Sequence, residues 1–432
     1  PDALIVDSGK EHSGDSGKQA QIDQRLIKLA KQGLSIVRLK GGDPLVFGRG
    51  AEEAAALAAE GIEFEIVPGV TSGVAAPAYA GIPVTHREHA SAVAFITGHE
   101  DPTRPAEALD WQALAAFPGT LAFYMGVKHL PQISERLITL GKSPETPVAV
   151  IERGTTAHQR TVCGTLADIA ELAQAATIRP PAMTVVGDVV GERERIAWFE
   201  HRPLLGRSVV VTRARAQASE LSARLRKLGA DVVEAPAIST RRRSDPEITV
   251  AIDSLEAYDL IAFTSVVGVD SFFDVLKDAG KDARALAGLS VAAIGGATST
   301  SLQGHGIAAD CIPERQTAEG LLEALSDVQG KRVLLAQAAQ GRKVLAEGLT
   351  LAGADVTKLS LYDTIAEELS PEQLADVARA EFVTFASGSS VRSFVSALGG
   401  PQAVATKKLV SIGPSTSTAL GEFGPPRRAQ HR

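Results

Sequence analysis

Sulfur-containing and aromatic residues are scarce in this chain. Its 432 residues include two cysteines, two methionines, two tryptophans and four tyrosines. Cys163 and Cys311 lie far apart, and neither belongs to a Cys-x-x-Cys pair or stands beside a histidine at metal-ligand spacing. A disulfide framework and a cysteine-based zinc site are therefore excluded, and we expect no metal ion.

The chain also lacks a long apolar run and an excess of basic residues. No apolar stretch reaches the length of about 18 residues that is needed to cross a bilayer, and no signal peptide opens the sequence,. The formal net charge is −7, whereas a general nucleic-acid binder needs a basic surface,. We therefore expect a cytoplasmic protein with small-molecule ligands, without a nucleic-acid or membrane partner.

Short apolar segments alternate with helical patterns, which predicts an α/β architecture. In the first half, a helix is expected at 130–140, and strands are expected at Ile62–Val67, Ala92–Thr97, Gly119–Tyr124, Val148–Glu152 and Ala182–Val186. The pattern breaks at 198–207, a polar segment with proline and glycine, before another expected strand at Ser208–Thr212. A chain of this length needs more than one core, so we place the main domain boundary there.

The most informative segment is a glycine-rich loop between a short apolar run, 34–37, and a helical pattern at 51–60. It reads Arg38-Leu39-Lys40-Gly41-Gly42-Asp43-Pro44-Leu45-Val46-Phe47-Gly48-Arg49-Gly50. The glycine pair lets the backbone approach a ligand closely, and Asp43 offers a carboxylate at the carboxyl end of a strand. The loop lacks the closing Gly-Lys-Ser/Thr of a P-loop and the third glycine of a dinucleotide fingerprint. It is therefore either another kind of ligand site or an ordinary strand-to-helix turn.

The loop resembles the signature loop of the uroporphyrinogen-III C-methyltransferases, within the tetrapyrrole methylase family. Further blocks follow in the family's order: Val67–Ser72, Ala76–Arg87, Thr97–His99, Phe123–Val127, Glu152–Thr155 with Gln159-Arg160, and Pro181–Gly187. The resemblance covers residues 1–200 and implies a tetrapyrrole methylase-type α/β domain. It also implies a homodimer formed through this domain.

The same resemblance implies S-adenosylmethionine as the methyl donor. It places at the cofactor Gly41, Gly42, Asp43, Val46, Thr71, Ser72, Met125 and Gly154. Arg87 is a candidate for binding the substrate's carboxylates, and Lys10 stands where the family has a lysine assigned to proton transfer. Other roles stay open: an Asx turn for Asp43, core packing for Met125, a turn glycine for Gly154 and a solvated side chain for Lys10.

Two features of the family are absent from this sequence. They are a glycine-rich loop after the first strand and a Tyr-Asp-Arg segment with an acidic catalytic candidate. The chain opens at Pro1-Asp2-Ala3, so we expect the domain to lack its first strand and to bind S-adenosylmethionine weakly or not at all.

The second half contains an internal repeat. Residues 263–272 are echoed at 385–394, 294–302 at 412–420, and 229–232 at 353–356. The longer echoes each contain a strand, a hydroxyl-rich turn and the start of a helix, and helix N-termini capped by Ser or Thr present N–H groups to anions. The repeat is too long for a solenoid, so duplicated α/β domains are expected.

This half resembles uroporphyrinogen-III synthase. The match rests on Val211–Arg213, Phe263–Ser265, Ile294-Gly295 with Thr298, Leu361–Thr364, Phe385–Ser387, and Ile412–Pro414 with Thr416. It implies a linker at 201–207 and two flavodoxin-like α/β lobes, 208–242 plus 367–432 and 243–366. It also implies Tyr362 as proton donor and, as ligands of substrate carboxylates, Arg213, Ser265, Thr298, Ser387 and Thr416. Hinge packing for the tyrosine and N-capping for the hydroxyl residues are the alternatives.

Together the two resemblances imply a bifunctional enzyme of tetrapyrrole biosynthesis. One half would cyclise hydroxymethylbilane to uroporphyrinogen III, with inversion of the D ring and loss of water. The other would methylate that product to precorrin-2, in the siroheme or cobalamin branch. The alternatives are a methylase acting on precorrins or ribosomal RNA, a synthase with a vestigial methylase domain, and a non-catalytic two-lobed anion binder.

Overall fold

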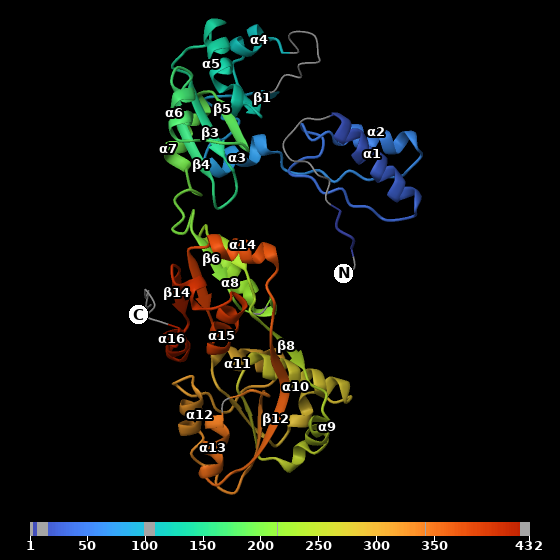
Figure 1. Cartoon of the computed structure of the whole chain (residues 1–432), viewed down its shortest axis with the longest axis vertical. Coiled ribbons are helices and arrows are strands. Elements are labelled where there is room, and N and C mark those ends of the chain that lie inside the picture. Colours follow the sequence, from blue (N-terminus) through green and yellow to red (C-terminus); the bar gives the residue numbers. More distant parts are fainter. Residues whose placement is uncertain (1–2, 7–15, 99–108, 214, 342, 424–432) are drawn as a thin grey trace. The chain divides into compact units, whose positions relative to one another are not determined.

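The chain divides into two compact units, which we describe one at a time from a computed structural model (Figure 1). The first unit comprises Pro1–Arg207 with Leu225–Asp231, and the second comprises Ser208–Arg224 with Val232–Arg432. The structure describes residues 3–6, 16–98, 109–213, 215–341 and 343–423. Within these ranges, no helix combines the length and the apolar character that a bilayer crossing requires.

The first unit is built around one mixed sheet. Its helices are α1 (Ser16–Lys31), α2 (Gly50–Ala59), α3 (Ser72–Ala80), α4 (Trp111–Ala116), α5 (Leu130–Thr139), α6 (Ile169–Ala175) and α7 (Arg193–Ile196). Its strands are β1 (Val93–Thr97), β2 (Thr120–Tyr124), β3 (Pro147–Glu152), β4 (Arg160–Thr165) and β5 (Ala182–Val186). The sheet has the order β1-β2-β5-β3-β4, with β1 and β2 parallel and the other neighbours antiparallel. The strands expected from residue 92 to 186 and the helix expected at 130–140 are confirmed.

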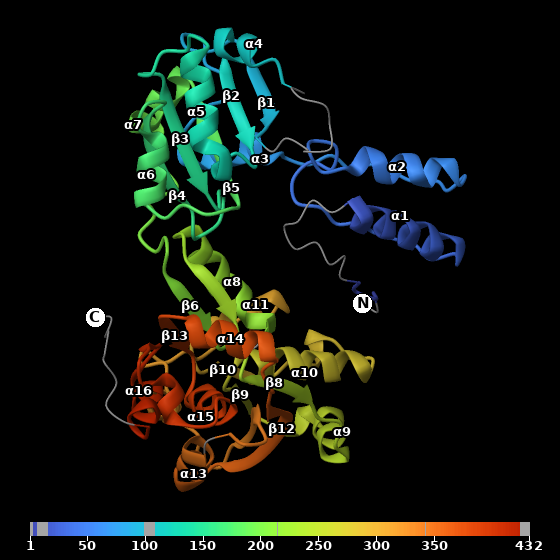
Figure 2. The same ribbon diagram turned by 45° about the horizontal axis from the view of Figure 1, so that its top comes forward.

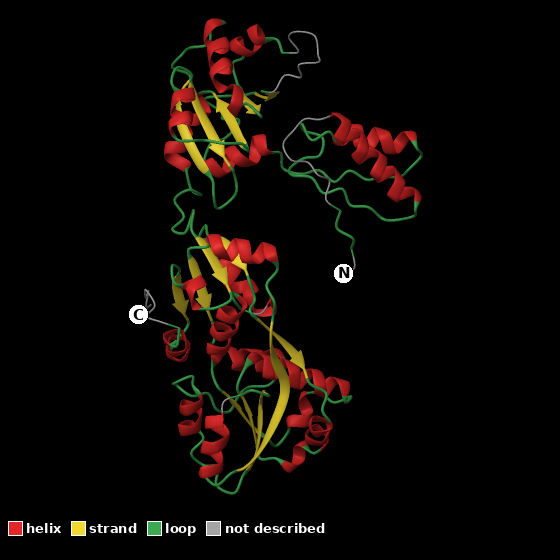
Figure 3. Cartoon of the chain, in the orientation of Figure 1, coloured by secondary structure: helices red, strands yellow, loops and turns green. Residues whose placement is uncertain are grey.

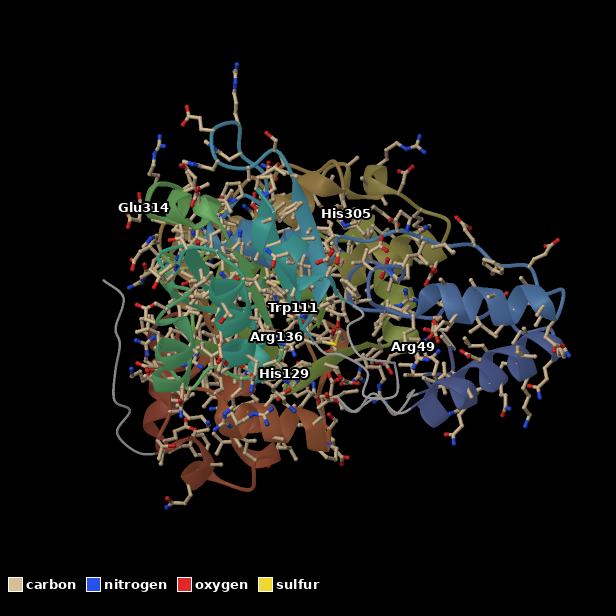
Figure 4. The ribbon with its side chains drawn as sticks, turned by 90° about the horizontal axis from the view of Figure 1, so that it is seen from above. Arg49, Trp111, His129, Arg136, His305 and Glu314 are labelled. Atoms are coloured by element: carbon tan, nitrogen blue, oxygen red, sulfur yellow. The ribbon has the colours of Figure 1, made fainter. Side chains whose placement is uncertain are left out.

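Successive residues of these strands pack on opposite faces of the sheet. Phe123 and Val150 belong to a buried cluster with α5 and α6, whereas Ala122 and Ala149 belong to a cluster with α3. A strand points its side chains alternately to the two faces, so strands buried on both faces carry continuous apolar runs. Figure 2 shows α5 and α6 beside the strands. The guanidinium of Arg136, on α5, lies 5.1 Å from the ring centre of Trp111, the first residue of α4 (Figure 4).

The prediction of a strand at Ile62–Val67 is wrong. This segment is drawn as a loop in Figure 3, and Phe64 and Val67 expose 46% and 72% of their surface. A strand needs partners for its backbone N–H and C=O groups and a buried face for its apolar side chains. The described residues supply neither here, and the apolar run at 34–37 is likewise not a strand.

The rest of the chain forms two further sheets. Its helices are α8 (Arg215–Lys227), α9 (Pro246–Asp253), α10 (Val266–Asp278), α11 (Gly296–Gly304), α12 (Ala318–Ala324), α13 (Lys343–Leu351), α14 (Pro371–Arg379), α15 (Gly388–Ala397) and α16 (Pro414–Gly421). Its strands are β6 (Ser208–Val211), β7 (Asp231–Glu234), β8 (Ile238–Arg242), β9 (Leu260–Phe263), β10 (Ser290–Ala293), β11 (Arg332–Ala338), β12 (Asp355–Ala366), β13 (Phe382–Phe385) and β14 (Lys408–Ser411).

The orders of these sheets are β10-β9-β11-β12-β8 and β14-β13-β6-β7. The long strand β12, yellow in Figure 3, pairs in parallel with β11 and then antiparallel with β8. We expected the residues of β8 in the lobe 208–242 plus 367–432, but β8 pairs in the sheet of the other lobe. The reason is that β8 continues the ladder along the second half of β12.

The internal repeat corresponds to two copies of the same arrangement. β9 pairs in parallel with β10, and β13 pairs in parallel with β14. Helices α10 and α11 follow the first pair of strands, and α15 and α16 follow the second. The two longer echoes therefore fall on equivalent strand-to-helix turns, and the expected α/β fold is confirmed.

Candidate functional site

Two of the predicted cofactor segments, the loop 41–50 and the turn 69–72, lie against each other. Gly42 has a φ of +81°, and a Cβ there would lie 3.3 Å from the carbonyl oxygen of Val70. A Cβ on Gly69 would lie 2.4 Å from the carbonyl oxygen of Gly42. Glycine is required by the positive φ at the first position and by the close approach at the second. This contact brings together Gly41, Gly42 and Asp43 with Thr71 and Ser72.

Asp43 joins the two segments through both oxygens of its carboxylate. Oδ1 accepts a hydrogen bond from the N–H of Leu45 at 2.8 Å, and Oδ2 accepts one from the N–H of Gly69 at 3.2 Å. These hydrogen bonds, first the one from the N–H of Leu45 and then the one from the N–H of Gly69, lower the pKa of Asp43 below its ordinary value,. The Asx turn expected as one alternative is present, and the carboxylate is ionised at neutral pH.

Tyr124, the last residue of β2, binds the same segments through its hydroxyl. The hydroxyl lies 2.6 Å from Oγ1 of Thr71 and accepts a hydrogen bond from the N–H of Gly73 at 2.8 Å. Its ring lies 4.7 Å, centre to centre, from that of Phe47 in the glycine-rich loop. The sequence predicts no role for Tyr124, although it is one of four tyrosines and directly precedes Met125. Tyr124 therefore links the loop to the first turn of α3.

Met125 and Gly154 follow β2 and β3. Met125 exposes 54% of its surface and has a φ of +55°, so it is not a core residue. A Cβ on Gly154 would lie 2.4 Å from the Cβ of Ala76 on α3. Gly154 thus allows the turn after β3 to approach the helix that begins at Ser72. Val46 packs, half-buried, against the apolar cluster that contains Ala76.

The charged residues near this region have different surroundings. Arg49 precedes α2 (Figure 4), and its guanidinium pairs with Glu52 at 2.6 Å. Arg87 is exposed, and its guanidinium has no ion pair or hydrogen bond to another described residue. Arg87 is therefore available to bind a carboxylate. Lys10 lies outside the described residues, so its role stays a prediction.

One cluster in the described part of the first unit has the composition of a metal site. The ligand atoms of His86, His89 and Glu192 lie within 4.8 Å of one another. However, Nε2 of His89 lies 3.1 Å from Glu192, which also lies 3.5 Å from Arg195. Nδ1 of His86 accepts a hydrogen bond from the N–H of Glu88 at 3.3 Å. Because these groups already have partners within the protein, we assign no metal here, and the expected absence stays a prediction.

In the second unit, Tyr362 lies on β12 with its hydroxyl 2.9 Å from Oγ of Ser265. Ser265 caps α10 and accepts a hydrogen bond from the N–H of Gly268 at 2.9 Å. Burial raises the pKa of Tyr362, although the bond to Ser265 acts in the opposite direction,. The neighbouring Asp363 pairs with Arg243 at 3.0 Å, which fixes this part of β12 beside β8. Tyr362 is thus a buried phenol that remains protonated at neutral pH.

The other predicted ligands of the second unit lie at helix starts, in two different environments. Ser387 caps α15 and accepts a hydrogen bond from the N–H of Ser390 at 3.1 Å, as Ser265 does in the first copy of the repeat. Thr298 and Thr416, by contrast, expose 4% and 2% of their surface. They are not caps, because Gly295 and Gly413 occupy the N-cap positions of α11 and α16. The half-buried Arg213 lies just after β6.

Comparison with known proteins finds one family in each half of the chain. The model of the Tetrapyrrole (Corrin/Porphyrin) Methylases matches residues 3–170, and that of Uroporphyrinogen-III synthase HemD matches residues 219–430. An S-adenosyl-L-methionine-dependent uroporphyrinogen III methyltransferase of Methanosarcina barkeri is 59% identical over 185 residues, covering 43% of this chain and 72% of that protein.

Two longer relatives extend across the boundary between the halves. A uroporphyrinogen-III C-methyltransferase of Bacillus subtilis is 40% identical over 332 residues, covering 76% of this chain and 68% of that protein. The porphyrin biosynthesis protein HemD of Ruminiclostridium josui is 34% identical over 401 residues, covering 91% of this chain and 79% of that protein. The chain therefore belongs to the tetrapyrrole methylase family through its first half and to the uroporphyrinogen-III synthase family through its second half.

Proposed function

We propose that the chain catalyses two consecutive steps of tetrapyrrole biosynthesis. The first is cyclisation of hydroxymethylbilane to uroporphyrinogen III, and the second is C-methylation of that product to precorrin-2 by S-adenosylmethionine. The observation that carries the proposal is the match of a single chain to both families, with one relative aligned over 91% of it. The product of one half is the substrate of the other, so the fusion is chemically coherent.

For the first unit, we infer that S-adenosylmethionine binds where the loop 41–50 meets the turn 69–72. When bound, this cofactor supplies an electrophilic methyl group to an electron-rich pyrrole carbon. The space beside Gly41 is open, the ionised Asp43 suits a cationic ligand, and the exposed Met125 offers an adaptable apolar wall,. The main contribution of the protein is to align the reacting groups and to exclude water. Arg87 is the candidate for the substrate's carboxylates.

For the second unit, we infer that Tyr362 donates a proton to the departing hydroxyl of hydroxymethylbilane. Breaking that C–O bond as neutral water requires a proton on the leaving oxygen. Tyr362 is buried, keeps its proton at neutral pH and is held by Ser265 at 2.9 Å. The first turns of α10 and α15, capped by Ser265 and Ser387, are suited to bind acetate and propionate groups through their N–H groups.

Incubation of the full chain with hydroxymethylbilane, with and without S-adenosylmethionine, tests both steps. We expect isomer III without the methyl donor and the dimethylated dihydro product with it, separated by chromatography. Formation of isomer I alone, the product of uncatalysed closure, would contradict the synthase step. Isomer III without methylation in both reactions would leave a synthase with a vestigial methylase domain. Calorimetric titration with S-adenosylmethionine then measures cofactor binding directly.

A homodimer formed through the first unit and a location in the cytoplasm are also part of the proposal. The dimer is implied by the resemblance to the methylase family, and the location by the composition of the sequence. Sedimentation equilibrium of the purified chain tests the first, and cell fractionation tests the second.

A further inference from the structure

A recess in the first unit, beside the turn that carries the predicted cofactor residue Gly154, is lined by basic side chains. Its volume is about 520 Å³, within the range of about 300–1,000 Å³ that is typical of small-molecule pockets. Arg153 and His158 line it from the turn after β3, Arg160 from the start of β4, and Thr177 and Arg179 from the segment before β5. The recess therefore combines a small-molecule volume with a concentration of positive charge.

These positive charges are only partly balanced within the described residues. Glu152 exposes 6% of its surface, pairs with Arg160 and accepts a hydrogen bond from the N–H of Arg179 at 3.3 Å. The exposed guanidinium groups of Arg153 and Arg179 have no ion pair or hydrogen bond to any described residue. Two guanidinium groups without partners, in a chain of net charge −7, suit a ligand with several carboxylates,.

The backbone around the recess is strained in the same way as the predicted cofactor segments. Six described residues other than glycine have a positive φ. Phe47, Arg49 and Met125 belong to the predicted cofactor segments, Arg153 and Thr155 flank the predicted cofactor residue Gly154, and Thr177 lines the recess. A left-handed conformation is particularly unfavourable for a β-branched residue, costs about 1–3 kcal/mol, and clusters at functional sites. The strained turn 153–155 therefore borders both the recess and the first candidate site.

Several hydrogen bonds hold this strained loop in place. The N–H of Thr155 donates to Oε1 of Gln159 at 2.7 Å, and the Gln159 amide donates to Glu200 at 2.8 Å. Gln159 exposes only 2% of its surface. Oγ1 of Thr156 donates to the carbonyl oxygen of Arg153 at 2.8 Å. The loop that presents Arg153 is therefore preorganised, which reduces the entropy lost on binding.

We propose that this recess is a second binding site of the first unit, for a polycarboxylate tetrapyrrole. Arg153 and Arg179 each bind one carboxylate, while the pair of Glu152 and Arg160 forms the floor of the site. The choice of ligand rests on the proposed function, because both proposed substrates are polycarboxylate tetrapyrroles. Inorganic phosphate offers the same anionic chemistry and is the second probe of the test.

Site-resolved arginine modification of the full chain tests the proposal. The chain is treated with phenylglyoxal alone, with uroporphyrin III or with inorganic phosphate, and each arginine is followed by peptide mass spectrometry. We expect uroporphyrin III to slow modification of Arg153 and Arg179 about tenfold, as at a site that is about nine-tenths occupied. Arg195, an exposed arginine paired with Glu192, should be unaffected. Equal modification of Arg153 and Arg179 in all three samples overturns the site, and equal protection by phosphate overturns the choice of ligand.

A double variant gives an independent measurement. In R153A/R179A, fluorescence titration should find one fewer bound uroporphyrin III than in the wild type, while calorimetry with S-adenosylhomocysteine should be unchanged. R195A is the matched control and should keep the wild-type stoichiometry. An unchanged stoichiometry in the double variant overturns the proposal. Neither measurement needs turnover, so this failure is distinguishable from failure of the cyclisation and methylation assay.

Discussion

At the scale of single residues, two buried tyrosines organise the candidate sites. The hydroxyl of Tyr124 lies 2.6 Å from that of Thr71, and the hydroxyl of Tyr362 lies 2.9 Å from that of Ser265. Tyr124 also accepts a hydrogen bond from a backbone N–H, so it holds the chain around a ligand site. The hydroxyl of Tyr362 has no such hydrogen bond to a described backbone group. The pairing of β12 with β8 sets the position of Tyr362. Loss of the two hydroxyls should therefore have different consequences.

Replacing Tyr362 with Phe should slow cyclisation and leave the fold intact. Loss of a general acid lowers turnover by about 10²-fold or more. The fold should stay intact because Ser265 still accepts its hydrogen bond from the N–H of Gly268. The measurement is the rate of isomer III formation, with Tyr258→Phe as the matched control for a tyrosine of the same core. Unchanged turnover in Tyr362→Phe would exclude the donor role.

The pH dependence of cyclisation should reflect the raised pKa of Tyr362. A phenol donates only in its neutral form, which persists below its pKa. Burial raises that pKa above the ordinary value of 10.0, so the donor is present throughout neutral and mildly alkaline solution. Activity that depends on Tyr362 should fall only as the pH rises through the raised pKa. Comparison of the pH–rate profiles of the wild type and Tyr362→Phe checks this. A difference in cyclisation rate between the two proteins that disappears as the pH rises from about 7 to about 9 would contradict it.

Replacing Tyr124 with Phe should weaken both the fold and cofactor binding of the first unit. The change leaves the N–H of the buried Gly73 without its acceptor, which costs about 1–3 kcal/mol of unfolding free energy. The affinity for S-adenosylhomocysteine should fall as well, because Thr71 loses its partner. Tyr79→Phe is the control, since the Tyr79 hydroxyl has no hydrogen bond to a described residue. Equal affinities in the two variants would remove the positioning role of Tyr124.

At the scale of elements, the sequence predicts best where an element is buried on both faces. The strands at 119–124 and 148–152 carry continuous apolar runs because helices cover both sides of their sheet,. The segment 62–67 instead alternates apolar residues with glutamates, as a half-buried strand does, but it has no partner strand among the described residues, so local pattern alone predicts it wrongly,. Strand pairing depends on residues far apart in the sequence. For the same reason, the local sequence does not predict that β8 pairs with β12.

The candidate sites show the same difference between what local motifs predict and what depends on contacts distant in sequence. Gly42, Asp43 and Thr71 were predicted together from adjacent motifs, and the structure places their segments in contact. The role of Tyr124 depends on how the end of β2 meets α3, which no local motif encodes. Thr298 was expected as a ligand at a helix start; it exposes 4% of its surface there, and its ligand role stays a prediction. Composition of a turn predicts the presence of a helix N-terminus, but not which side chains of the first turn are exposed.

The contact between α1 and α2 depends on a buried carboxylate. Glu53 of α2 exposes 5% of its surface, lies 2.7 Å from Nζ of Lys40 and accepts a hydrogen bond from Gln19 of α1 at 3.1 Å. Burial alone would raise the pKa of Glu53, but the bonds from Lys40 and Gln19 outweigh burial and leave the pKa below the ordinary value of 4.5. This ion pair therefore stabilises the fold above the ordinary pKa, and its contribution is lost as the pH falls through the lowered one.

Replacing Glu53 with Gln should destabilise this helix pair. Removing one partner of a buried ion pair costs about 3 kcal/mol, because the other charge stays buried. Lys40 is that charge, with 11% of its side chain exposed. Amide exchange of α1 and α2 at neutral pH measures the effect, and Glu52→Gln, on the exposed side of α2, is the control. The difference between wild type and Glu53→Gln should shrink in acid, and a difference that grows there would contradict the assignment.

At the scale of the whole molecule, the two units have separate hydrophobic cores. Each of the buried clusters among the described residues is confined to one unit. Phe123 in the first unit and Phe263 in the second are both fully buried. A chain with two independent cores is not expected to unfold in a single two-state transition, and the two proposed activities should be separable by damage to one core.

Replacing Phe123 or Phe263 with Ala tests this independence in both directions. Each change removes a buried ring and costs about 3–5 kcal/mol in its own unit. Phe123→Ala should lower one calorimetric transition and the rate of methylation of added uroporphyrinogen III, while cyclisation of hydroxymethylbilane stays near the wild-type rate. Phe263→Ala should do the reverse. If both variants lose both activities together, or shift a single common transition, the two units depend on each other for stability and the fusion is one cooperative structure.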